Sequence, residues 1–237
     1  MSQPADYQSE NENPLPTQTH LPIQDNVPPH LQLLSTLDHL LVKQKIEFFE
    51  VFTGIETCNR YEIKNKEGEV IYYAFEEDDC CSRACYRPAD RPFDIRIWST
   101  DKTEIIHLRR EFDCSCCGTP QMLHVYSPPG NLVGIVEQNF TWFAPSFDIQ
   151  NEHGQAVLKL SGPVNRTAFF SDVDFKIKSL DKSTVVGKIS KQWGGLKREW
   201  FTDADLFGIS FPLDLDVRIK AVLFGACFLI DFMFFEH

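Results

Sequence analysis

Cysteine side chains are the groups in this sequence whose type and spacing most directly suggest chemistry. Three of the eight cysteines form one short run, Cys114, Cys116 and Cys117, and two others stand at Cys81 and Cys85. The spacing Cys114-x-x-Cys117, paired across a hairpin with Cys81-x-x-x-Cys85, could bind zinc through four thiolates. The same side chains could instead remain free thiols or carry acyl chains. The spacing alone leaves these three alternatives open.

Signatures of enzymes are missing from the sequence. It has no Gly-rich phosphate loop, no H-E-x-x-H motif and no recognisable set of nucleophile, base and orienting residue. The formal net charge of −11 argues against general affinity for nucleic acid or anionic lipid, because proteins that bind phosphates through charge are normally basic. A binding or transport protein therefore fits the sequence better than an enzyme that makes or breaks bonds.

Residues 1–30 are predicted to form a disordered tail. They hold six of the fourteen prolines, many polar residues and almost no large apolar ones. They therefore cannot bury enough apolar surface to offset the conformational entropy lost on ordering. The tail lacks a basic segment followed by an apolar stretch, so no secretory signal is expected and the chain starts in the cytosol. It also contains no P-x-x-P or P-P-x-Y string, so SH3 and WW partners are not expected.

The segment 221–235 is apolar on every side and is interrupted only by Asp231. A helix without a polar face must be surrounded by protein or by lipid. About 15 residues in a helix span some 22 Å, whereas a bilayer core of about 30 Å needs roughly 20. We therefore favour a helix buried in the core of the domain, with a membrane span as the alternative. Representative members of this hydrophobic helix are Ala221, Phe224, Phe228, Ile230 and Phe234.

Alternation of apolar and polar residues predicts strands through most of the domain that follows the tail, 31–237. Hairpins are expected at 61–75, 93–108, 123–138, 147–160 and 173–190. A short amphipathic segment is expected at 31–41, and a last strand at 207–219 leads into the helix. Serial hairpins without intervening helices indicate an all-β sheet closed on itself. We therefore predict a closed antiparallel β-barrel that encloses the hydrophobic C-terminal α-helix.

Several long runs in this chain resemble the phospholipid scramblase family. The main ones are F-T-D-A-D-L-F-G-I-S-F-P-L-D-L-D-V at 201–217 and G-A-C-F-L-I-D-F-M-F-F-E at 225–236, with shorter ones at 59–65, 128–130, 172–175 and 187–191. The resemblance covers about 33–236. It implies a Tubby-like fold of twelve strands around a hydrophobic helix, and Ca²⁺-activated, ATP-independent, bidirectional movement of phospholipids between leaflets. The alternative is a membrane-tethered Tubby-like adaptor with signalling or nuclear roles and no lipid transport.

The resemblance also implies a Ca²⁺ site in the segment 203–214. The residues concerned are Asp203, Asp205, Phe207, Ile209, Phe211 and Asp214. Against the EF-hand rule, aspartates occupy positions one and three, but positions five and nine are apolar and position twelve lacks the usual glutamate. Any Ca²⁺ site here is therefore expected to be weak. Alternatively, Asp203 and Asp205 only cap or turn into a strand.

Membrane attachment is a further implication of the resemblance. Cys114, Cys116 and Cys117 lie where the family carries a cysteine-rich palmitoylation run, whereas 164–170 replaces a second family cluster. The implied location is the cytoplasmic face of the plasma membrane, held by lipid or by a single span, with membrane phospholipids as partners.

A nuclear role rests on the segment 187–193, which resembles an atypical nuclear-import signal. Its candidate residues are Lys188, Lys191 and Trp193, with an importin as the implied partner. Signalling proteins are a second implied class of partner. The alternative for this segment is a strand end with solvated lysines.

Overall fold

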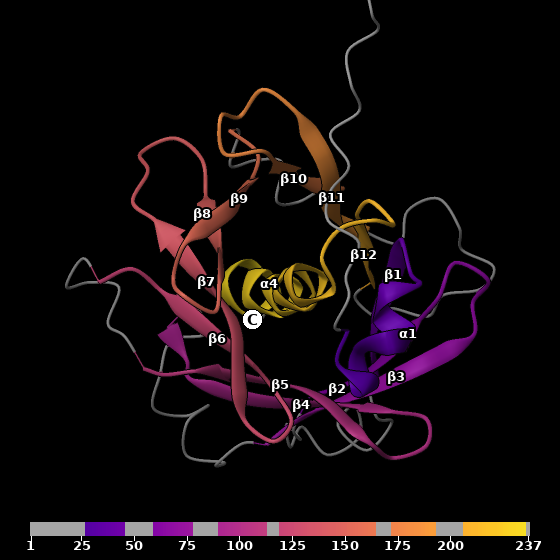
Figure 1. Ribbon diagram of the computed structural model, residues 1–237. Coiled ribbons are helices and arrows are strands. Elements are labelled where there is room, and N and C mark those ends of the chain that lie inside the picture. Colours follow the sequence, from indigo (N-terminus) through magenta and orange to yellow (C-terminus); the bar gives the residue numbers. More distant parts are fainter. Residues whose placement is uncertain are drawn as a thin grey trace, which may run out of the picture.

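The computed structural model describes residues 27–45, 59–77, 90–112, 119–164, 172–192 and 206–235. In these ranges, twelve antiparallel strands close into a barrel around one long helix (Figure 1). The strands are β1 His39–Lys45, β2 Arg60–Lys64, β3 Val70–Glu76, β4 Phe93–Ser99, β5 Glu104–Arg110, β6 Met122–Ser127, β7 Asn131–Asn139, β8 Ser146–Asn151, β9 Ala156–Ser161, β10 Val173–Lys178, β11 Val185–Gln192 and β12 Leu206–Ser210. The predicted closed barrel with a C-terminal helix is confirmed.

The barrel is a simple meander in which each strand pairs with its neighbours in sequence. β1 and β12 close it, with His39 opposite Ser210 and Val42 opposite Phe207. All five predicted hairpins are present. Gly68, in the turn between β2 and β3, has a φ of +86°, as that position predicts for a glycine. Local turn chemistry therefore determines much of the order of the sheet.

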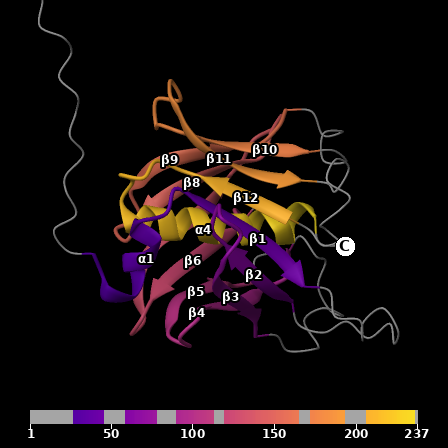
Figure 2. The same cartoon turned by 90° about the vertical axis from the view of Figure 1, so that its right-hand side faces the viewer.

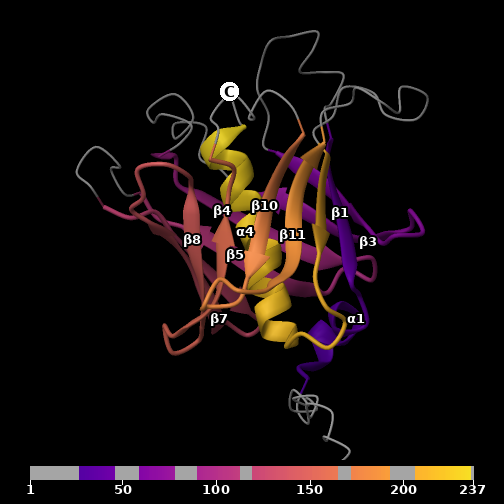
Figure 3. The ribbon, with the colours of Figure 1, turned by 90° about the horizontal axis from the view of Figure 1, so that it is seen from above.

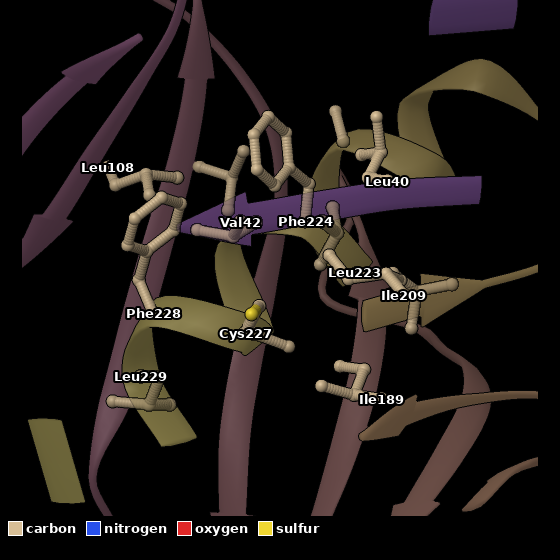
Figure 4. Packing of buried hydrophobic residues seen from close by; sticks show 14 of the residues in the cluster. Leu40, Val42, Leu108, Ile189, Ile209, Leu223, Phe224, Cys227, Phe228 and Leu229 are labelled. Atoms are coloured by element: carbon tan, nitrogen blue, oxygen red, sulfur yellow. The ribbon is translucent and has the colours of Figure 1, made fainter. Parts of the chain in front are cut away.

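The helix α4, Val217–Phe234, runs through the barrel from one end to the other (Figure 2). Leu223, Phe224 and Phe228 have no more than 1% of their surface exposed and lie against inward-facing strand residues such as Val42 and Leu108 (Figure 4). Aromatic pairs continue this packing along the helix. The predicted burial of the helix in the core is therefore confirmed.

The hydropathy of the helices bears on the alternative of a membrane span. Among the ranges that the structure describes, none of the helices combines the length and apolar character that crossing a bilayer requires.

The last strand is shorter than predicted. The expected strand at 207–219 was wrong beyond Ser210, where β12 ends. Pro212 has no N–H with which to continue a sheet ladder, and the chain turns. Asp216 then accepts a hydrogen bond from the backbone N–H of Arg218 at 2.7 Å and caps α4. The apolar alternation after Pro212 therefore belongs to a turn and the first turn of the helix.

The amphipathic segment predicted at 31–41 is only partly helical. A 3₁₀ turn at Pro29–Leu31 and the short helix α1, Gln32–Ser35, precede β1. Leu40 points into the barrel while Leu41 is half-buried, the period of two that belongs to a strand. The leucines of this segment thus belong to two elements, α1 and β1, and their spacing in the sequence did not show where one ends and the other begins.

The two ends of the barrel differ. At the end that we call the turn end, strands are joined by short connections at 65–69, 100–103, 128–130, 152–155 and 179–184. At the other, the loop end, the connections are 46–59, 77–92, 111–121, 140–145, 162–172 and 193–205. α4 begins at the turn end and finishes at the loop end (Figure 3). The barrel therefore presents one compact end and one with longer segments.

We expect Gly134→Ala in β7 to lower the free energy of unfolding by about 3 kcal/mol, the upper range for overpacking. A Cβ at Gly134 would overlap the Gln150 carbonyl oxygen and lie 2.6 Å from a methyl group of Val222 in α4. The matched control is Gly208→Ala in β12, whose Cβ would meet only Leu41 at 3.7 Å. Denaturant unfolding measures both; equal stabilities would contradict the close approach of β7 to α4.

Candidate functional site

The five cysteines singled out for zinc binding or acylation belong to connections at the loop end. Cys114, Cys116 and Cys117 fall in the connection between β5 and β6, and Cys81 and Cys85 in the one between β3 and β4; all five lie outside the described residues. Acylation, free thiols and zinc binding by these cysteines therefore stay predictions. Within the described ranges, no group of three or more His, Cys, Asp or Glu side chains is arranged to hold a metal.

The segment predicted to bind Ca²⁺ is divided by β12. Asp203 and Asp205 lie outside the described residues, just before the strand begins at Leu206. Asp214 is exposed in the turn after the strand, at the turn end. A strand rises about 3.3 Å per residue, so the two ends of β12, at Leu206 and Ser210, are about 13 Å apart, and Asp214 follows the end at Ser210. An EF-hand loop instead wraps its ligands around one ion.

The apolar residues of that segment face the core. Phe207, Ile209 and Phe211 are 2%, 1% and 4% exposed, and their side chains point into the barrel. The ring of Phe207 packs edge-on against Phe235, with centroids 5.7 Å apart. These three side chains therefore support the packing of the barrel around α4.

The two described lysines of the predicted import segment point in opposite directions. Lys188 is exposed and its Nζ lies 3.1 Å from Oδ2 of Asp174. Lys191 is 2% exposed, and its Nζ lies 4.1 Å from the ring centroid of Phe235. Trp193 is outside the described residues. The alternative, solvated lysines at a strand end, agrees with Lys188 in its exposure but not in its place, because Lys188 lies in the middle of β11, and it is wrong for the buried Lys191.

A group of buried polar side chains surrounds the C-terminal turn of α4. Arg91 pairs with the carboxylate of Glu76, and its guanidinium lies 4.6 Å from the ring centroid of Phe232. Tyr61 donates a hydrogen bond of 3.3 Å to Asp231, which gives this charged residue a partner inside the barrel. Cations near a helix C-terminus are favourable because the helix dipole is negative there. The sequence pattern did not reveal this group, because its members come from separate strands and connections.

Cys227, in α4, is the one cysteine that the described ranges contain. Burial raises the pKa of its thiol, the nearby Asp231 raises it further, and Lys191 acts in the opposite direction. A thiol with a raised pKa and no access to solvent is a poor nucleophile and a poor acylation target. Cys227 is therefore not expected to take part in thiol chemistry.

An aromatic surface also lies at the loop end. Phe140, Trp142 and Phe143, in the connection between β7 and β8, are 79%, 82% and 79% exposed. They border a cavity of about 500 Å³ whose other lining residues include Pro120 and Phe234. The uncharged run F-T-W-F was visible in the sequence, but only its exposure distinguishes it from core residues.

Comparison with known proteins gives a consistent match. The family model described as Scramblase matches residues 17–237. The chain is 54% identical over 214 residues to "Phospholipid scramblase 1" of Homo sapiens, covering 89% of this chain and 67% of that protein. It is 54% identical to the protein of the same name in Mus musculus, with 90% and 65% covered, and 43% identical to human "Phospholipid scramblase family member 5", with 90% and 79% covered. The chain thus spans about two thirds of the length of the first two. No solved structure matches it, so the Tubby-like relationship stays a prediction.

Proposed function

This chain belongs to the scramblase family, and we propose that it mediates Ca²⁺-activated, ATP-independent, bidirectional movement of phospholipids between membrane leaflets. The observation that carries the proposal is the family match over residues 17–237, together with relatives that are named phospholipid scramblases. Lipid transport, rather than chemistry on a substrate bond, is the corresponding class of activity.

The position of α4 constrains how lipid could move. Its side chains fill the barrel, with Phe224 and Phe228 almost completely buried. If the protein itself moves lipid, headgroups must pass along its outer surface or past a rearranged barrel. The same burial favours the second candidate function, a membrane-tethered Tubby-like adaptor with signalling or nuclear roles, because an adaptor needs no path for lipid.

Reconstitution of the purified chain distinguishes these two functions. Proteoliposomes carry a headgroup-labelled fluorescent phospholipid, and dithionite bleaches only the label that it can reach. With Ca²⁺ and without ATP, we expect dithionite to bleach a larger fraction of the labelled lipid than in protein-free liposomes, where it bleaches only the label in the outer leaflet. Bleaching that stops at the outer leaflet, from protein that is bound to the liposomes, would favour the adaptor.

We further propose that Ca²⁺ acts through Asp203 and Asp205 with a weak affinity of about 10⁻⁴–10⁻³ M, as few converging carboxylates provide. Asp205→Ala should abolish Ca²⁺ binding measured by calorimetry and the Ca²⁺ dependence of bleaching. Asp214→Ala is the matched control, because β12 separates Asp214 from the loop end. Loss of Ca²⁺ binding in the control would mean that Asp214 is also a Ca²⁺ ligand. Micromolar Ca²⁺ binding that survives Asp205→Ala would mean that the site lies elsewhere.

Attachment to the cytoplasmic face of the plasma membrane is proposed to involve thioacylation of Cys114, Cys116 and Cys117. One acyl chain binds membranes only marginally and two give stable anchoring, so replacing all three cysteines with alanine should release the protein to the soluble fraction of cells. Replacing the buried Cys227 with alanine is the control and should leave fractionation unchanged. Membrane fractionation that persists in the triple variant would reject acylation as the main anchor.

Nuclear import is proposed as a secondary role through the segment that contains Lys188. Of the two described lysines, only the exposed Lys188 is accessible to an importin. Lys188→Ala should therefore reduce nuclear accumulation, scored by microscopy; an unchanged distribution would remove this segment from consideration.

A further inference from the structure

We propose that the aromatic connection between β7 and β8, formed by Phe140, Trp142 and Phe143, inserts into the interfacial region of a phospholipid bilayer and turns the loop end of the barrel toward the membrane. The proposal rests on the proposed function, which places the substrate in a membrane, and names the surface that meets it. We call these three side chains the aromatic tip.

Exposure is the first support. The three side chains of the aromatic tip are 79–82% exposed within four consecutive residues. Phe140 and Trp142 pack edge-on, with centroids 6.1 Å apart, and so present one joint surface. Soluble proteins rarely leave large apolar side chains gathered in this way unless the surface meets a partner.

The chemistry of the tip selects lipid as that partner. Trp joins an apolar body to one N–H donor, and it is enriched where hydrocarbon meets headgroups. The run from Asn139 to Pro145 contains no charged residue, so its insertion requires no charge to lose water. The net charge of −11 gives the chain little electrostatic attraction to anionic lipid, so a chain without acyl groups depends on apolar insertion for its affinity.

The base of the tip is held in place by the barrel. The Thr141 hydroxyl donates to the Ala144 carbonyl, and the Gly162 N–H donates to the Pro145 carbonyl at 2.8 Å. Gly162 lies so close to Pro145 that an added Cβ would be 2.6 Å from the proline ring. The tip is thus presented from a closely packed base and does not need to order on binding.

The position of the tip agrees with contact at the loop end. Met233 and Phe234, in the last turn of α4, line the same cavity as Phe140 and Phe143, as does Pro120 from the connection between β5 and β6. The sheet encloses the rest of α4, so the long helix offers little apolar surface of its own to a bilayer. Among the described residues at this end, Phe112 and Val164 are also exposed, at 47% and 73%, but the aromatic tip brings three exposed aromatic side chains together and so provides the larger apolar contact.

The test uses the full chain made in bacteria, which lacks acyl chains, and vesicles of phosphatidylcholine alone, which carry no net charge. Co-flotation with vesicles measures the partition coefficient of the protein. The depth of Trp142 in the bilayer is measured by quenching of its fluorescence with brominated lipid, in a chain whose other tryptophans have been replaced by phenylalanine. We expect the triple variant Phe140→Ser, Trp142→Ser, Phe143→Ser to bind at least about 100-fold more weakly, from the apolar area removed. Its thermal unfolding should match that of the unaltered chain, because the replaced side chains are exposed.

The matched control replaces exposed apolar residues at the turn end, Val185→Ser and Leu213→Ser, which are 55% and 60% exposed. Weaker binding of the tip variant alone, with quenching of Trp142, supports the proposal. Equal binding by both variants, absence of quenching, or a tip variant that changes only self-association in sedimentation would overturn it. Because the assay records binding, it can succeed for a chain that does not move lipid, and it can fail for one that does.

Discussion

A chain truncated at Asp216, and so lacking α4, will not fold cooperatively. Fifteen residues of α4 are buried, from Val217 to Phe232, and they occupy the interior that the inward faces of the strands surround. Each large apolar side chain contributes about 1.5–3 kcal/mol when buried, so their sum exceeds the 5–15 kcal/mol that stabilises a typical domain. The truncated chain would instead expose the strand residues that now contact the helix.

The measurement compares residues 27–216 with residues 27–237. Thermal unfolding followed by circular dichroism, together with size-exclusion chromatography, should show a cooperative transition for the longer chain and an aggregated or molten species for the shorter. A subtler variant, Phe228→Asp, should behave like the truncation, since Phe228 packs 5.0 Å from the ring of Tyr61. A soluble, β-rich, cooperatively unfolding truncated chain would show that the barrel does not depend on its helix.

Replacing Lys220 with methionine is expected to lower the free energy of unfolding by about 3–5 kcal/mol, because each buried carbonyl left without its donor costs about 1–3 kcal/mol. Lys220 is 0% exposed, and its ammonium donates to the carbonyls of Ser35, Leu37 and Leu213 at 2.9, 2.8 and 2.8 Å. These bonds join the first turn of α4 to α1, to the segment between α1 and β1 and to the turn after β12. Methionine keeps the length of the side chain but leaves three carbonyls without their donor.

The electrostatic surroundings of Lys220 act on its charge in two directions. Burial lowers the pKa of its ammonium, while the charges of Asp38 and Asp214 act in the opposite direction. Chemical denaturation of Lys220→Met and of a control, Lys188→Met, gives the comparison. Lys188 forms an exposed ion pair, which contributes about 0–1 kcal/mol. Similar losses in the two variants would mean that the three carbonyls find water or other donors.

The sequence determined those features that depend on neighbouring residues. Alternation in the strands, Gly68 in a turn and the continuous apolar run of α4 each reflect local geometry, so the hairpins, the closed barrel and the buried helix were all predictable. The prediction of a strand beyond Ser210 was wrong for the same reason: alternation does not register that Pro212 and Asp216 end a strand and begin a helix.

Only the tertiary structure decided which residues meet across the barrel. It brought Lys220 within hydrogen-bond distance of the Ser35 carbonyl in α1, and it buried Lys191 while leaving Lys188 exposed. It placed Asp214 after the end of β12 that is opposite Leu206. It also left Phe140, Trp142 and Phe143 in solvent, although their composition alone resembles that of a core. Burial and distance depend on how separate segments pack, and a one-dimensional pattern carries no record of that packing.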